Sequence, residues 1–283
     1  IGIPKTVDND LLLTDNCPGF GSVAKYVATS IREAGLDVKS MSETSTKVFI
    51  LEVMGRNSGW IAASAGLSKE KANDPPHIIL FPEVPFNKSK VLKKVTSSIK
   101  RYGYCVMAVS EGTRYKNGTF LSDAGLTDAF GHKQLGGIAP KISSLIQESL
   151  GYKCHWAVSD YLQRSARHIA SKVDLQQSLA VGEAAVKFAL SGENSVMPVI
   201  IRNKGKSYTW KIGKIPLSRV ANIEKVLPKR YISKDGFGIT KSCKNYMLPL
   251  IQGEAFPPYE NGVPTIAKLR NILVKKKLKK FII

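Results

Sequence analysis

The chain has 283 residues, of which 43% are hydrophobic, enough to bury one large core or two ordinary ones. Its 42 lysines and arginines outnumber 22 aspartates and glutamates, and the net charge of +20 favours an anionic partner: nucleic acid, an anionic membrane or phosphorylated metabolites. No apolar run approaches the roughly 20 residues of a membrane span, which argues against a membrane protein. The four cysteines have no CxxC spacing, so we expect reduced thiols in a cytoplasmic protein.

The first predicted helix contains Val23, Val27 and Ile31 at four-residue spacing, with Ser22 placed to cap it and Gly35 to end it. A second helical pattern over residues 91–99 ends at Gly103, and a third runs from about 174 to 190. Between and after the helices lie apolar runs that predict strands: 47–53, 77–81, 104–109, 197–202 and 208–212. Such alternation of strand and helix predicts an α/β fold in which helices cover parallel sheets.

Polar residues gather where three of the apolar runs end. Asp8 and Asp10 end the first run of the chain, Glu52 and the segment 54–56 close a predicted strand, and Ser110-Glu111-Gly112 closes another. Ligands of open α/β sheets bind beyond the carboxyl ends of the strands. We therefore expect the three clusters to converge on one crevice.

Taken singly, these motifs have ordinary structural explanations. Asp8-Asn9-Asp10 could form a turn, because Asp and Asn bond to their own backbone. It could equally supply one carboxylate that accepts a proton and another that holds Mg²⁺. Arg56 and Arg164 could be solvated surface charges, and Glu111 could cap the element that follows it.

In their order along the chain, however, the motifs PKTVDND, VMGRNSGW, AVSEGTR, YLQRS and MLPLIQGE closely resemble the phosphofructokinase family. The resemblance covers essentially the whole chain. It is closest to the pyrophosphate-dependent branch, where PKTIDND replaces the PGTIDND of the ATP-dependent enzymes. The stretches DNCPGFGSVAKYVA, FPEVPF and DAFGHKQLGGIAP also look like that branch.

The resemblance implies a phosphofructokinase-like fold of two three-layer α/β domains with mostly parallel sheets. Residues 1–37 would end the donor domain and carry the catalytic loop, residues 38–164 would form the sugar-phosphate domain, and residues 165–283 would complete the donor domain. It also implies that the N-terminal part of the first domain, with its glycine-rich donor loop, precedes Ile1 and is missing from this chain.

The implied reaction is reversible phosphoryl transfer from pyrophosphate to fructose 6-phosphate, with Mg²⁺ as cofactor. By resemblance, Asp8 is the base that accepts the proton of the sugar's 1-hydroxyl, Thr6 lies near the transferring phosphoryl group, and Asp10 binds the metal. Lys5 selects the donor, because relatives that use ATP have glycine there and leave space for the nucleotide's α-phosphate. The lysine fills that space and attracts pyrophosphate.

The family pattern also assigns the sugar-phosphate contacts. Met54, Gly55 and Arg56 would contact the sugar phosphate, Arg56 also countering charge at the reacting end, and Glu111 would bond the sugar hydroxyls. The 6-phosphate would be bound by Tyr161 and Arg164, with tyrosine where ATP-dependent relatives usually carry histidine.

Two positions depart from the family pattern in this region. Lys47 stands where many relatives have an arginine that reaches the 6-phosphate of a neighbouring subunit, and His155 stands where another arginine is usual. Lysine keeps the charge but loses the bidentate fork of arginine. The family also implies a homodimer or higher homo-oligomer, because some substrate contacts come from a neighbour.

Three alternatives stay open: an ATP-dependent phosphofructokinase, a non-catalytic regulatory paralogue and a nucleic-acid binder. Lys5 argues against the first, and the intact Asp8 argues against the second. The dispersed lysines argue against nucleic acid, since the one dense basic run, residues 275–280, is typical of a solvated tail.

Overall fold

A four-stranded parallel sheet forms the centre of the molecule in a computed structural model that describes residues 1–127, 133–135, 137–205 and 207–279. The strand order is β2 (Ile78–Leu80), β3 (Cys105–Ser110), β1 (Val48–Val53) and β6 (Cys154–Val158). The last residue of β1, Val53, lies opposite the last residue of β3, Ser110. The segments that follow these two strands therefore leave the sheet at the same edge.

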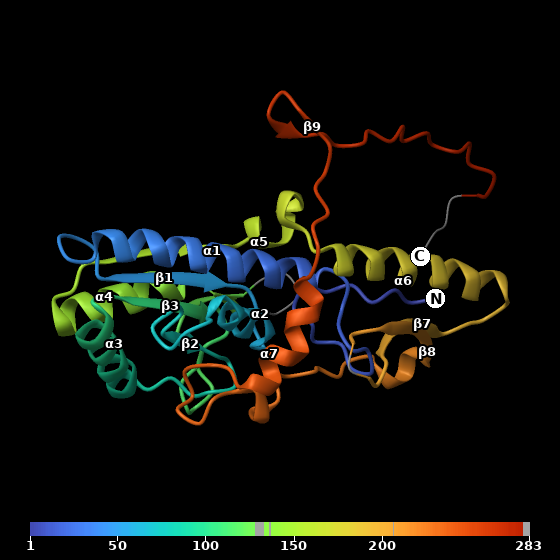
Figure 1. Cartoon of the computed structure of the whole chain (residues 1–283). Coiled ribbons are helices and arrows are strands. Elements are labelled where there is room, and N and C mark those ends of the chain that lie inside the picture. Colours follow the sequence, from blue (N-terminus) through green and yellow to red (C-terminus); the bar gives the residue numbers. More distant parts are fainter. Residues whose placement is uncertain (128–132, 136, 206, 280–283) are drawn as a thin grey trace.

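Helices cover both faces of this sheet (Figure 1). Helices α1 (Phe20–Met41) and α2 (Trp60–Ser64) share a core with Leu51 and Val53 of β1. Helices α3 (Lys88–Tyr102) and α4 (Ile138–Leu150) share the opposite core with Val48 and Ile50. Alternate residues of one strand thus face opposite cores, as the two-residue period of a strand requires. The predicted α/β fold with a parallel sheet is confirmed.

The first helix differs from the prediction at both Ser22, expected to cap it, and Gly35, expected to end it. It begins after Gly19 and passes through Gly35 to Met41, while the Ser22 hydroxyl bonds to Asp174 instead of capping the helix. A Cβ at Gly35 would lie 2.5 Å from the Cγ of Pro75, so this glycine allows close packing and does not end the helix. The predicted end of α3 at Gly103 is confirmed, with φ of 86° at that glycine.

The second region contains α6 (Lys172–Leu190), β7 (Val196–Arg202) and β8 (Trp210–Pro216). The predicted strand over 208–212 begins two residues later and runs further. β7 and β8 pair antiparallel. The predicted boundary between residues 37 and 38 falls inside α1, and the division into domains stays a prediction.

The remaining elements are short. They comprise α5 (Leu162–Ser165), α7 (Lys241–Met247), β4 (Asp123–Thr127), β5 (Lys133–Leu135), β9 (Tyr259–Glu260), β10 (Val263–Pro264) and the 3₁₀ turns η1 (Ala65–Ser68), η2 (Arg167–Ile169), η3 (Leu217–Arg219), η4 (Lys229–Tyr231) and η5 (Leu248–Ile251).

The C-terminal segment leaves the body as an extended arm (Figure 1). Lysines 275–277 and 279 are exposed there, as predicted, and Lys280 lies outside the described residues, as do 128–132 and 136 of the DAFGHKQLGGIAP stretch. Within the described part of the chain, no helix is both long and apolar enough to cross a membrane.

Candidate active site

The loop that carries Asp8 places this carboxyl group among several charges. Burial, together with the carboxylates of Asp10 and Glu111, raises the pKa of Asp8 from its ordinary 3.8 to about 6, while Lys5 and Arg164 oppose the shift. The Thr6 hydroxyl accepts a hydrogen bond from the Asp8 backbone N–H at 3.1 Å. Residues from widely separated parts of the sequence therefore act electrostatically on one partly buried carboxyl group.

The same loop is anchored through Asn9, which is fully buried and has a φ of 57°. Its amide nitrogen donates to the Tyr246 hydroxyl at 3.2 Å. Its amide oxygen accepts bonds from the Cys17 N–H at 3.0 Å and from the Lys225 ammonium at 3.1 Å. Asn is one of the few residues that tolerate this left-handed conformation. The fixed backbone at Asn9 directs the two flanking carboxylates.

Lys225 is a functional neighbour that sequence reasoning missed. Its ammonium also donates to the carbonyl oxygens of Thr14 and Asp15, and its backbone N–H donates to the Asp10 carbonyl at 2.6 Å. Burial lowers the pKa of Lys225. Nothing in the local sequence around residue 225 marks this lysine among 42 basic residues, because its partners lie far away along the chain.

The loops after β1 and β3 touch through two glycines. A Cβ at Gly112 would lie 1.9 Å from the Arg56 carbonyl oxygen, and one at Gly55 would lie 2.5 Å from the Ser58 carbonyl oxygen. Gly55 has a φ of 121°, which side-chain-bearing residues rarely adopt. The Ser110 hydroxyl donates to the Gly55 carbonyl at 2.6 Å. The two strand-end motifs thus form one packed unit.

This unit orients Glu111, whose carboxylate accepts a hydrogen bond from the Gly55 N–H at 3.1 Å. Burial raises the pKa of Glu111, and the Gly55 bond and the Arg56 charge oppose the increase. The segment after β6 joins this unit through Gln163. The side-chain oxygen of Gln163 accepts a hydrogen bond from the Met54 N–H at 3.3 Å.

Tyr161 and Arg164 follow β6 at the same edge of the sheet. The Arg164 guanidinium lies 4.1 Å from the centre of the Tyr161 ring, and the tyrosine itself is 62% exposed. Arg164 is near enough to lower the pKa of Asp8. An arginine and a tyrosine hydroxyl held together and open to solvent suit the binding of an anion.

An open cavity of about 760 Å³ is lined by Lys5 and Asp10. Its remaining walls include Leu11, Met197 and Leu217. Lys5 is exposed to this space. The lining therefore contains a cation, a carboxylate and apolar side chains. Lys5 and Asp10 are part of the Asp8 loop, so the cavity lies beside that loop.

Lys47 and His155 lie away from this edge. Lys47 precedes β1, so it lies at the opposite end of that strand from Met54, and its ammonium donates to the Ser42 carbonyl at 2.5 Å. His155 is exposed on β6, a strand at the sheet margin. Neither residue joins the charges around Asp8 in this chain.

Asp8 and Asp10 fit the requirements of a magnesium ion. In the described residues, no group of three or more His, Cys, Asp and Glu side chains forms a metal cluster. Mg²⁺ does not need one, because it binds through one or two carboxylates and completes its shell with water and substrate phosphates. The Asp10 carboxylate raises the pKa of Asp8, and a cation near both would relieve that repulsion.

Comparison with known proteins agrees with this arrangement. The pattern of the family described as Phosphofructokinase matches residues 1–189. The chain is 58% identical over 281 residues to the pyrophosphate–fructose 6-phosphate 1-phosphotransferase of Halomonas elongata, covering 99% of this chain and 67% of the relative. It is 54% identical to the protein of the same name from Methylococcus capsulatus, covering 98% of this chain and 66% of that one.

Solved structures resemble the chain equally closely. The pyrophosphate-dependent phosphofructokinase from Marinobacter aquaeolei has a TM-score of 0.90 at 55% identity, with 98% of this chain and 66% of that chain covered. The chain thus spans about two thirds of the length of these relatives. The match of sequence pattern, overall sequence and tertiary structure leads to one assignment: this chain belongs to the phosphofructokinase family.

Proposed function

We propose that the protein transfers a phosphoryl group reversibly from pyrophosphate to the 1-hydroxyl of fructose 6-phosphate, a glycolytic reaction. The observation that carries the proposal is the position of Asp8. The charges of Lys5 and Asp10 in its own loop act on its carboxyl group, and so do those of Glu111 and Arg164 from the segments after β3 and β6. The names of the relatives at 54–58% identity support the same reaction.

In this mechanism, the sugar's 1-hydroxyl gives its proton to Asp8 as its oxygen attacks the nearer phosphorus of pyrophosphate. The bond between that phosphorus and the bridging oxygen breaks, and phosphate leaves. A pKa of about 6 keeps Asp8 ionised near neutral pH while leaving it basic enough to accept a proton. The reverse reaction uses the same group as an acid.

Charge neutralisation is the second requirement of phosphoryl transfer. Lys5 would hold pyrophosphate in the open cavity, Arg56 would counter charge at the reacting end, and Thr6 would contact the transferring group. Asp10 would hold Mg²⁺, which supplies neutralisation of the phosphate oxygens when bound.

A second group of residues would bind the sugar phosphate. Tyr161 and Arg164 would bind the 6-phosphate, and Glu111 would accept hydrogen bonds from the sugar hydroxyls. Met54 and Gly55 would line the site through the backbone geometry that Gly112 and Gln163 impose. All of these residues follow the carboxyl ends of β1, β3 and β6. A shared substrate site requires them at one edge of the sheet.

Lys47 and His155 fit a contribution to a second copy, because both lie outside this chain's own site. The exposed margin strand β6 also carries Trp156, which is 47% exposed. We therefore infer a homodimer or higher homo-oligomer, and sedimentation velocity of the protein would test it. The four free cysteines fit a cytoplasmic location.

Steady-state assays of the full-length protein with fructose 6-phosphate, Mg²⁺ and either pyrophosphate or ATP test the donor. We expect activity with pyrophosphate in the wild type and a loss of about 10²-fold or more in Lys5→Gly, since the lysine contributes charge where the donor binds. Lys234→Gly, which removes an exposed loop lysine elsewhere, is the matched control. A wild type that prefers ATP would overturn the donor assignment, and activity with neither donor would favour the regulatory paralogue.

A further inference from the structure

Arg114 follows the Glu111-Gly112 motif after β3, and it takes no direct part in the proposed reaction. The residue is half-buried, and its guanidinium lies 4.6 Å from the centre of the Phe120 ring. Its backbone carbonyl accepts a hydrogen bond from the Phe86 N–H at 2.8 Å. Both the backbone and the side chain of this arginine are therefore held in place, unlike those of a solvated surface charge.

The guanidinium of Arg114 holds the middle of the loop that follows β1. Its Nη2 donates to the Arg56 carbonyl at 3.0 Å and to the side-chain oxygen of Asn57 at 3.3 Å. Its Nε donates to the Gly112 carbonyl at 3.3 Å. A planar guanidinium carries five donors in a fixed fork, so it sets the distances between the acceptors that it binds. The backbone from which the Arg56 side chain projects is thereby fixed.

Other side chains hold this loop on either side of Arg114's contacts. On one side, the Gly55 N–H donates to the Glu111 carboxylate at 3.1 Å. On the other side, the Gly59 N–H donates to the Glu83 carboxylate at 2.9 Å. Arg114 holds the stretch between these two anchors.

The same contacts lead on to the segment that carries Asp10. The side-chain nitrogen of Asn57 donates to the Glu224 carboxylate at 2.7 Å. Glu224 lines the open cavity that also contains Lys5 and Asp10. The residue after Glu224 donates its backbone N–H to the Asp10 carbonyl at 2.6 Å. A continuous series of bonded residues therefore joins Arg114 to Asp10.

The two ends of this series carry different duties in the proposed reaction. Arg56 would counter charge at the reacting end, and Asp10 would hold Mg²⁺. Phosphoryl transfer depends mainly on how accurately such charges are positioned around the reacting phosphate. An arginine suits the task of holding them, because its guanidinium keeps its proton at every pH at which the protein is folded.

We propose that Arg114 is a positioning residue that fixes Arg56 relative to Asp10. It acts through the hydrogen bonds of its guanidinium and through the bond between Asn57 and Glu224, and it does not itself contact the substrates. Its effect on turnover rests on the proposed function, whereas its effect on the order of the loop does not.

Hydrogen exchange of the full-length protein without substrates, read by mass spectrometry, tests the order of the loop. We expect the amides of residues 54–59 to exchange about tenfold faster or more in Arg114→Met than in the wild type. Methionine fills part of the same space beside Phe120 but donates no hydrogen bond. Unchanged exchange in this variant would overturn the proposal, whatever the activity of the protein.

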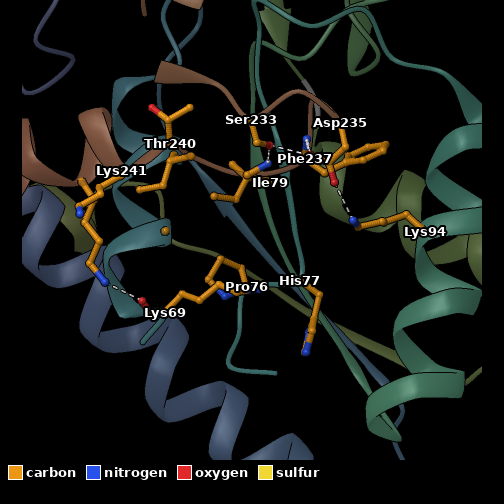
Figure 2. Close-up of a pocket in the computed structure, with 14 residues that line it drawn as sticks. Lys69, Pro76, His77, Ile79, Lys94, Ser233, Asp235, Phe237, Thr240 and Lys241 are labelled. Carbon is orange, nitrogen blue, oxygen red and sulfur yellow. Dashed lines mark hydrogen bonds and ion pairs between the residues drawn. The ribbon is translucent and has the colours of Figure 1, made fainter. Parts of the chain in front are cut away.

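Lys94 provides the matched control. Its ammonium lies 2.7 Å from the Asp235 carboxylate and 5.8 Å from the centre of the Phe237 ring, in a cavity of about 340 Å³ against β2 (Figure 2). Lys94→Met thus removes a cation that, like Arg114, holds a loop beside an aromatic ring. We expect no change in exchange at residues 54–59. Equal acceleration in both variants would indicate general loosening of the fold and would also overturn the proposal.

Steady-state kinetics of the full-length protein show whether Arg114 acts through Arg56. Arg114→Met should lower kcat/KM for fructose 6-phosphate about tenfold or more. In the Arg56→Met background, the same substitution should lower it less than about twofold, because the group that Arg114 positions is already gone. Equal losses in the two backgrounds would contradict the positioning role. A wild type that is inactive with either donor would overturn the proposed function, and the exchange measurement would still decide the order of the loop.

The bond between Asn57 and Glu224 can be reversed to test the link to Asp10. Asn57→Asp removes the donor and sets two carboxylates together, so kcat should fall about fivefold or more. Adding Glu224→Gln supplies a donor from the other side and should restore kcat to within about twofold of the wild type. A double variant as slow as Asn57→Asp alone would show that this bond does not position Arg56 relative to Asp10.

Discussion

Lys225 donates a hydrogen bond to the side-chain oxygen of Asn9 at 3.1 Å, across 216 positions of sequence. This bond joins the loop of Asp8 and Asp10 to a segment after η3. The ammonium of Lys225 also lies 5.4 Å from the centre of the Trp60 ring, in the helix that follows the Gly55-Arg56 loop. One lysine therefore touches both the proposed catalytic loop and the element behind the sugar-phosphate loop.

Replacing Lys225 by methionine removes the cation but keeps much of the side chain's length. We expect the free energy of unfolding to fall by about 2–4 kcal/mol, because three oxygen acceptors lose a charged donor. We also expect kcat to fall more than tenfold as the Asp8 loop loosens. Urea unfolding and steady-state kinetics measure the two effects.

Lys187→Met, on the exposed side of α6, is the control for that substitution and is expected to change neither quantity appreciably. If Lys225→Met had wild-type stability and kcat, the anchoring role of Lys225 would be wrong.

Gly112 and Gly182 form a matched pair of glycines. A Cβ at Gly112 would lie 1.9 Å from the Arg56 carbonyl oxygen, whereas nothing lies within 4 Å of one at Gly182 in α6. We expect Gly112→Ala to destabilise the fold by about 3 kcal/mol or more and to raise KM for fructose 6-phosphate, because backbone must move.

Gly182→Ala is expected to stabilise the fold by about 0.5–1 kcal/mol, since alanine is the better helix former. Thermal unfolding of both variants measures the contrast. Similar melting temperatures for the two variants would contradict the close packing of the two loops.

The raised pKa of Asp8 predicts opposite effects of pH on activity and stability. Activity should fall as pH drops through about 6, because protonated Asp8 accepts no proton. Ionisation of Asp8 is disfavoured in the folded state, so its contribution to stability is present below the ordinary pKa of 3.8 and is lost as pH rises through about 6.

Asp8→Asn should therefore lower kcat by about 10²–10⁴-fold and raise the melting temperature near pH 8. The rise in melting temperature should disappear below about pH 4. Glu33→Gln, an exposed substitution on α1, should show neither effect. A melting-temperature difference that stays constant with pH would show that Asp8 is not the group concerned.

Asp174 joins the start of α1 to α6. Its carboxylate accepts bonds from the Gly19 N–H at 2.8 Å, the Ser22 N–H at 3.0 Å and the Ser22 hydroxyl at 2.6 Å. Asp174→Asn leaves one acceptor oxygen for three donors, and we expect a loss of about 1–3 kcal/mol in unfolding free energy.

Asp37 lies exposed on α1, and Asp37→Asn should lower the unfolding free energy far less than Asp174→Asn in chemical denaturation. Equal losses for the two variants would contradict the capping role of Asp174.

The sequence alone determined the class of the fold and the residues to inspect. Strands 48–53 and 105–110 were predictable because short apolar runs report burial directly, and Gly103 ends its helix as predicted. The motifs around Asp8, Arg56, Glu111 and Arg164 pointed to the family because residue types in order along a chain are visible without a structure.

Only the tertiary structure showed the features that depend on contacts between residues far apart in the sequence. Gly35 was predicted to end a helix, but its helix continues because the missing side chain admits Pro75 from another segment. Lys225 and Asp174 carry no local signal, since their partners lie more than 150 positions away. The pKa of Asp8 likewise arises only when distant charges are brought together. Local patterns report propensity and burial, whereas packing and electrostatics depend on which distant residues meet.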